Sequence, residues 1–100
     1  MKLLLISFFL FPLLLFGQTE ELDKKFTSAE THIKKGKYKK AIKVYSKIIA
    51  KDEHNGLAYF KRAMLKNKIG RDFCSDLKLA CKYEGVEQKS ACENHELYCQ

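Results

Sequence analysis

The chain repeats itself at an interval of 34 residues. Four residues recur at that interval: Phe26, Ala29, Lys34 and Gly36 return as Phe60, Ala63, Lys68 and Gly70. A period of this length is typical of a helix–turn–helix unit copied along a chain, in which neighbouring units bury the apolar faces that one unit leaves open. The repeat predicts a scaffold that holds other molecules, and it argues against an enzyme.

The first 17 residues have the pattern of a secretory signal peptide. Lys2 gives a positive start, an uncharged and mostly apolar run covers residues 3–16, and the small Gly17 follows. The run is shorter than the about 20 residues that a membrane-spanning helix needs, and no cysteine follows it to carry a lipid anchor. We expect cleavage after Gly17, export to a bacterial periplasm or to the medium, and no stable membrane anchor in the mature chain. An uncleaved anchor is the alternative.

The mature chain, residues 18–100, suffices for one small domain. Its charge is uneven, because residues 24–51 hold ten lysines and one acid, Glu30, whereas the residues from Glu84 onward hold four acids and one lysine. A basic N-terminal part and an acidic C-terminal part favour head-to-tail electrostatic steering between molecules, or a polyanionic partner. The lysines also alternate with apolar residues at helical spacing. We favour the simpler interpretation that they form a solvated helix face.

Glycines divide the mature chain into helices. Gly36, Gly70 and Gly85 each follow an apolar-periodic stretch, the place where a left-handed residue ends a helix. The apolar positions of the first four helices recur at helical spacing. They are Leu22, Phe26, Ala29 and Ile33, then Ala41, Ile42, Tyr45, Ile48 and Ile49, then Leu57, Phe60, Ala63 and Met64, and last Phe73, Leu77 and Ala80. A fifth helix is predicted from about Val86 to Cys99. No stretch alternates like a strand, so the fold class is all-α, with antiparallel neighbouring helices.

Two segments resemble the tetratricopeptide repeat. One is Lys35-Gly36-Lys37-Tyr38-Lys39-Lys40-Ala41-Ile42, with Tyr45, Ile48 and Asp52 after it, and the other runs from Ala58 to Gly70. The resemblance covers about residues 22–84 and implies about two stacked helical hairpins, closed by a C-terminal helix. Lys25 departs from the family by replacing the usual large aromatic residue, and Glu53 replaces the closing proline. We therefore expect a weaker contact between the first two helices.

The resemblance also implies where a partner binds. In this family the first helix of each repeat lines a concave groove that holds a peptide or a partner helix. When the repeats of this chain are aligned with the family, the positions that contact the ligand correspond to Glu30, Lys34, Phe60, Met64, Asn67 and Lys68. Phe60 and Met64 share a helix face because they are four residues apart, and methionine beside an aromatic ring suits an adaptable apolar site. The alternative is that both are buried against the fifth helix.

The cysteines, at positions 74, 81, 92 and 99, have spacings of seven, eleven and seven. Seven residues of helix span about 10 Å, more than the roughly 7 Å that two bridged Cα atoms allow, so no bridge forms within a helix. Two pairings remain. In two antiparallel helices, the residues that lie opposite each other have numbers with a constant sum. The pairs Cys74–Cys99 and Cys81–Cys92 have the same sum, so we favour this pairing. Export would supply the oxidising compartment.

A zinc site is the rival interpretation of the same region. Cys92, His95 and Cys99 fall on one helix face, and Cys81 would complete a tetrahedral set. The chain has no cysteine pair separated by two residues, and export favours disulfides over thiolates. Reduced cysteines packed as small apolar side chains are the remaining alternative. We expect disulfides and no metal or cofactor.

No pattern in the chain predicts catalysis. It has no nucleophile turn, no glycine-rich phosphate loop and no isolated pair of carboxylates. His32 falls where the repeat has an aromatic residue, and His54 lies in a polar break. We expect a non-enzymatic, exported interaction module with a protein or peptide partner and no nucleic acid partner. The alternatives are a structural protein that self-associates through its first helix, and an exported polyanion binder that uses the lysine-rich first repeat.

Overall fold

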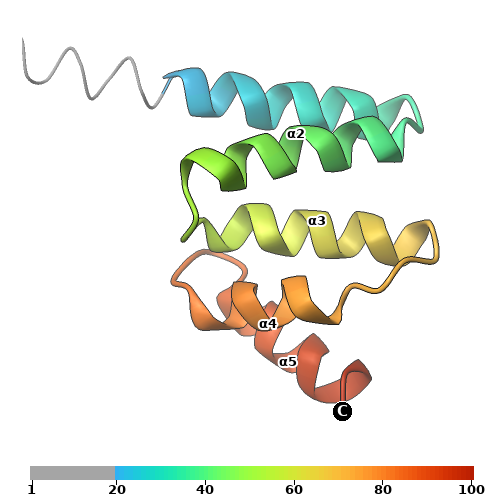
Figure 1. Cartoon of the computed structure of the whole chain (residues 1–100), viewed down its shortest axis with the longest axis vertical. Coiled ribbons are helices and arrows are strands. Elements are labelled where there is room, and N and C mark those ends of the chain that lie inside the picture. The colour runs from blue at the N-terminus through green and yellow to red at the C-terminus, as the bar shows by residue number, and fades with distance from the viewer. Residues whose placement is uncertain (1–19) are drawn as a thin grey trace, which may run out of the picture.

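The computed structural model describes residues 20–100, so the predicted signal peptide lies outside the described residues. A first helix runs through residues 20–34 and is followed by α2 (Tyr38–Lys51), α3 (Gly56–Lys68), α4 (Cys74–Lys82) and α5 (Gln88–Tyr98). Successive helices lie antiparallel and stack along the long axis of the molecule (Figure 1). The all-α prediction is confirmed. Over residues 20–100, no helix combines the length and the apolar character that crossing a membrane requires.

Two of the three predicted glycine helix ends adopt the left-handed conformation. Gly36 has a φ of 72° and Gly70 a φ of 74°, values that a side chain would strain. The prediction for Gly85 is wrong, because its φ is not in the left-handed region. The helix α4 ends at Lys82, and the residue that follows it, Tyr83, has an extended conformation. The close approach at this turn falls on Gly56, where a Cβ would lie 2.9 Å from the Tyr83 backbone oxygen.

A first core cluster joins the helix of residues 20–34 to α2 and α3. Tyr45 and Ile48 are fully buried at its centre, and the Phe26 ring meets the Tyr45 ring edge-on at a centroid distance of 5.8 Å. All four apolar residues predicted for the first helix pack into this cluster. Its amphipathic stripe is therefore used as the spacing predicts.

A second core cluster joins α3, α4 and α5 around Leu77, which is fully buried. Here the prediction for α3 is partly wrong. Within α3 the structure buries Ala58, Tyr59, Ala63 and Leu65, and leaves the predicted core positions Leu57, Phe60 and Met64 only half-buried. The reason is that α3 packs against α2 on one side and α4 on the other, so its buried residues occupy two faces instead of one stripe.

A hollow of about 470 Å³ lies between the start of the first helix and the end of α2. It is lined by Glu21, Leu22, Lys25, Ile48, Lys51 and Asp52. The Lys25 Nζ atom lies 3.6 Å from Glu21 Oε1, which also accepts a 2.8 Å hydrogen bond from Lys51 Nζ. Lys51, with Lys25, lowers the pKa of the Glu21 carboxyl. Lys25 therefore lines an open space beside the contact between the first helix and α2.

Two disulfides join α4 and α5. Cys74 pairs with Cys99 at a Cα–Cα distance of 5.6 Å, and Cys81 pairs with Cys92 at 4.6 Å. The nested pairing is confirmed, and no cysteine is free. A zinc site would need the same sulfur atoms as thiolates, and residues 20–100 contain no cluster of three or more His, Cys, Asp or Glu side chains arranged to hold a metal ion.

Candidate functional site

Glu30, the first of the six predicted contact residues, links the first helix to its neighbours. Its Oε1 atom accepts a 3.2 Å hydrogen bond from the Tyr45 hydroxyl and lies 3.6 Å from the Lys61 Nζ atom on α3. Burial, together with the Glu30 charge, raises the pKa of the Tyr45 hydroxyl. The carboxylate therefore holds the first helix, α2 and α3 together, and it is half-exposed beside α3.

Phe60 and Met64 occupy one face of α3. Both are half-buried, and both pack against the second core cluster, which includes Ala91 of α5. Their side chains thus contribute to the core and keep part of their surface open. Packing against this cluster agrees with the alternative interpretation, burial toward the fifth helix, and the apolar contact site stays a prediction.

The remaining three predicted contact residues are exposed and lie toward one end of the helices. Lys34 ends the first helix, and Asn67 and Lys68 end α3. The Lys68 Nζ atom lies 5.3 Å from the centroid of the Tyr38 ring at the start of α2. The six residues are consequently not one continuous patch: Glu30, Phe60 and Met64 lie midway along their helices, and the other three lie at the helix ends.

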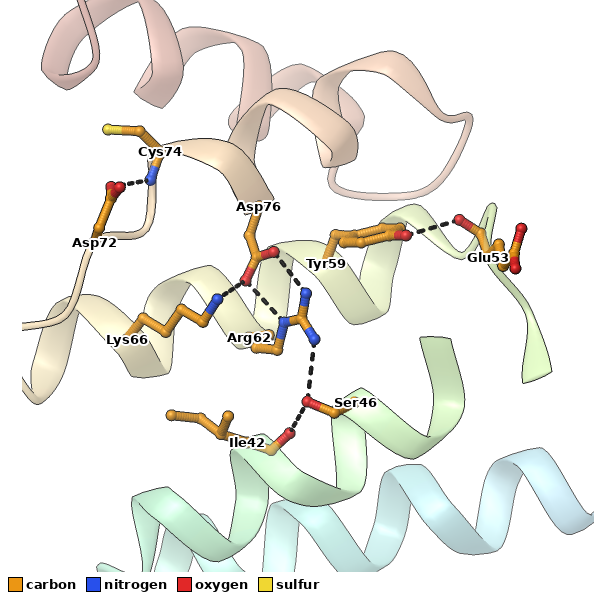
Figure 2. A network of polar contacts seen from close by, with 9 residues as sticks. All are labelled: Ile42, Ser46, Glu53, Tyr59, Arg62, Lys66, Asp72, Cys74 and Asp76. Carbon is orange, nitrogen blue, oxygen red and sulfur yellow. Dashed lines mark hydrogen bonds and ion pairs between the residues drawn. The ribbon is translucent and has the colours of Figure 1, made fainter. Parts of the chain in front are cut away.

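Sequence reasoning missed a network of charges centred on Asp76 (Figure 2). Asp76 is 2% exposed and accepts hydrogen bonds of 2.8 Å from both Nε and Nη2 of Arg62. Its second partner is Lys66, whose Nζ atom lies 2.9 Å away. Arg62 Nη1 donates to Ser46 Oγ at 3.0 Å, and the Ser46 hydroxyl donates to the Ile42 carbonyl at 2.8 Å. The network connects α2, α3 and α4.

The partners of Asp76 decide its charge. Burial raises the pKa of the Asp76 carboxyl, but the hydrogen bonds and charges of Arg62 and Lys66 outweigh burial, so its pKa lies below the ordinary value. Asp76 in turn raises the pKa of Arg62. Because every charged group here is paired, we assign the network a structural role. The signal in the sequence was the i, i+4 spacing of Arg62 and Lys66 together with Asp76 as the lone acid of α4.

The exposed surfaces at the two ends of the stack differ in polarity. The exposed residues of the first helix are all polar: Glu20, Glu21, Asp23, Lys24, Thr27, Ser28, Thr31 and Lys34. Among the described residues, the exposed large apolar side chains are Val86, Leu97 and Tyr98, at the opposite end. An association through the first helix, one of the predicted alternatives, would therefore use a polar surface.

No family model, no curated protein and no solved structure matches this chain. The class that the fold itself defines is a short stack of antiparallel helical hairpins with a disulfide-linked C-terminal helix. The resemblance to the tetratricopeptide repeat rests on the 34-residue period and its glycine turns.

Proposed function

We propose that this protein is an exported, non-enzymatic interaction module of the tetratricopeptide class. It binds a peptide or a partner helix on the face formed by the first helix, α3 and α5. The observation that carries the proposal is the placement of Phe60 and Met64, two apolar side chains that keep exposed surface in the middle of α3. A contiguous apolar patch rimmed by polar residues is typical of a protein interaction site, and we propose that Phe60 and Met64 form the centre of such a patch.

The packing of α3 supports this role. The helix contacts α2, α4 and α5, and the Arg62–Asp76 network ties it to α2 and α4. A helix held on several sides presents its open face with little loss of conformational freedom on binding, which favours affinity. The Glu30–Lys61 ion pair provides a polar rim beside Phe60.

The disulfides support export. Bridges of this kind form and persist in oxidising compartments such as the bacterial periplasm or the extracellular medium. Two disulfides in a chain of 100 residues match a protein that carries a signal peptide.

A single charge placed on the open face tests the groove. We expect Met64→Lys to abolish capture of the partner that co-purifies with the wild-type protein, because the lysine would have to bury its charge in the apolar contact. Ala50→Lys is the matched control, since it adds the same charge at an exposed position of α2. Helicity by circular dichroism should stay close to that of the wild type, and the melting temperature should fall only modestly, because Met64 is half-buried against the second core cluster.

A large fall in the melting temperature of Met64→Lys would mean that Met64 is a core residue. Asn67→Glu is then the second variant, because Asn67 is exposed one helical turn beyond Met64, toward the end of α3, and its substitution leaves the core intact. Capture that survives Asn67→Glu as well contradicts the proposed groove. A mass that rises with concentration in light scattering, with no captured partner, would support self-association instead.

A further inference from the structure

The turns between the helices lie at two opposite edges of the fold, and the side chains at these two edges carry charges of opposite sign. Since the helices are antiparallel, the turns after the first helix and after α3 lie at one edge, and those after α2 and α4 lie at the other (Figure 1). We call residues 34–40 and 66–71 the basic edge. Its exposed cations are Lys34, Lys35, Lys37, Lys39, Lys40, Lys68 and Arg71. Neither range contains an acidic residue.

The two segments of the basic edge form one surface. Lys68 lies over the Tyr38 ring, and Ile69 shares a hollow of about 300 Å³ with residues 36–40. Within these two ranges Lys66 is paired with Asp76, but α2 begins at the edge with no acid in its first turn and no side-chain cap. Lysines at the positive end of a helix dipole are locally unfavourable. The first acid beyond the edge is Asp72, which accepts a hydrogen bond from the Cys74 backbone.

The opposite edge is acidic. The turns over residues 52–55 and 83–87 carry Asp52, Glu53, Glu84 and Glu87. The lysines that directly precede them are Lys51, which pairs with Glu21, and Lys82, whose Nζ atom lies 5.5 Å from the centroid of the Tyr83 ring. The two turns lie together, because the His54 ring stacks on the Tyr83 ring at a centroid distance of 4.6 Å. The acidic start of the first helix joins them through the Glu21–Lys51 ion pair. The charge of the molecule is thus separated across its width.

We propose that the basic edge docks on the surface of a bilayer containing anionic phospholipids. Six of its seven exposed cations are lysines, compact and strongly hydrated charges that suit a diffuse negative potential better than a bidentate phosphate site. The acidic edge faces away from such a surface and is repelled by it, so the charge separation fixes the orientation of the bound protein. This inference goes beyond the groove and does not depend on it.

The aromatic content of the basic edge favours a lipid surface over a nucleic acid as its partner. Binding to single strands uses open aromatic faces on which bases stack. Tyr38 is the only aromatic residue within the basic edge, and Lys68 covers its ring. The surface that we propose therefore differs from the one predicted for a polyanion, which was the lysine-rich first repeat. The basic edge includes Lys68 and Arg71 from the second repeat, and it excludes Lys43 and Lys47 of α2.

Vesicle co-sedimentation of the oxidised protein tests the proposal. Wild-type protein should bind vesicles of phosphatidylglycerol and phosphatidylcholine, and should not bind vesicles of phosphatidylcholine alone. Because a lysine near an anionic membrane contributes about fivefold in binding, the triple variant Lys37→Gln, Lys39→Gln, Lys40→Gln should lose on the order of a hundredfold. Its fold should survive, since these side chains are exposed. Lys34 and Lys68 stay unchanged, because they are also predicted groove contacts.

The control triple Lys24→Gln, Lys43→Gln, Lys47→Gln removes the same charge from exposed positions outside the edge and should keep most of the binding. An equal loss in both triples would show that net charge attracts the protein without using this edge, which overturns the proposal. So would the absence of binding to the anionic vesicles. Tighter binding to a single-stranded oligonucleotide at equal phosphate concentration would overturn the lipid assignment.

Discussion

At the scale of single residues, Asp76 is the buried charge on which the middle of the stack depends. Its carboxylate is almost inaccessible, and Arg62 grips both of its oxygens while Lys66 contacts one. Bidentate pairing of this kind fixes the relative position of two helices as well as their distance. Because Arg62 also reaches Ser46, the same contact sets the position of α2.

Asp76→Asn should destabilise the protein strongly. The substitution leaves Arg62 and Lys66 without a counter-charge, and breaking a buried pair costs about 3–5 kcal/mol. The two cationic side chains are 19% and 22% exposed, so we expect about 2–3 kcal/mol, measured by urea unfolding. Asp72→Asn is the control, because an asparagine at this exposed site can still accept the hydrogen bond of Cys74 and should be nearly neutral. Equal losses in the two variants would contradict the assignment.

Acidification should weaken the fold through the same residue. The pKa of Asp76 is lowered in the folded state, so the unfolded state binds more protons between the folded value and the ordinary value of about 4. The stabilisation is therefore complete above about pH 4 and is lost as the pH falls through the folded pKa. Melting temperatures measured down a pH series should fall more steeply for wild type than for Asp76→Asn. Parallel curves would show that Asp76 is not the responsible group.

At the scale of elements, α5 is the helix with the least packing of its own. Ala91 is its only buried residue, whereas α2 and α3 each bury several. Its attachment comes from two disulfides and from the Gln88 side chain, which donates to the Cys81 carbonyl at 3.0 Å. The two bridges close loops with sequence separations of 25 and 11 residues. In the chain-entropy account, a bridge that closes a loop of about this size adds about 3 kcal/mol to the free energy of unfolding. The bridges thus let a weakly amphipathic helix cover the apolar side of α4.

Reduction should loosen α5 before the other helices. Without the bridges, a helix with one buried side chain has little to hold it, so its amides lose protection first. Hydrogen exchange with mass spectrometry, before and after reduction and alkylation, measures this for residues 88–98. The amides of α2 serve as the internal control, because α2 lies in the first core cluster and carries no bridge. Protection of α5 that survives reduction would contradict the prediction.

At the scale of the whole molecule, the stack has two cores that meet at α3. Ile49 packs against both clusters, and the Asp76 network crosses from one to the other. Each helix from α2 to α5 mainly contacts its sequence neighbours. In such a chain stability is nearly a sum of local terms, so its two ends open independently. Both bridges lie in the second half, and the hollow beside Lys25 lies in the first.

In the oxidised protein the first helix should therefore open before α4. Native-state hydrogen exchange should show faster exchange over residues 20–34 than over residues 74–82, since the first helix carries no disulfide whereas two bridges hold α4. Ile48→Ala should speed exchange in the first helix and leave α4 nearly unchanged, because Ile48 is buried in the first cluster alone. Uniform acceleration along the chain would instead show a single cooperative unit.

The features that depend on local spacing could be predicted from the amino-acid sequence. Apolar residues at intervals of three and four predict the burial of the first helix and of α2, because side chains at that spacing share a face. The left-handed conformation of Gly36 and Gly70 at helix ends was predictable, because residues other than glycine rarely adopt it. The cysteine pairing follows from antiparallel geometry, which local connections alone impose.

Other features depend on which helices become neighbours in the folded chain, and no local pattern predicts them. Gly56 is needed because the turn after α4 passes over it, and α3 buries two faces because α2 and α4 enclose it. Asp76 on α4 pairs with Arg62 on the preceding helix α3, 14 residues earlier in the chain. The basic edge also exists only after folding, since it joins two turns from different repeats. Local patterns specify which residues turn inward, but charges and close contacts take partners from distant segments that only the packed stack brings together.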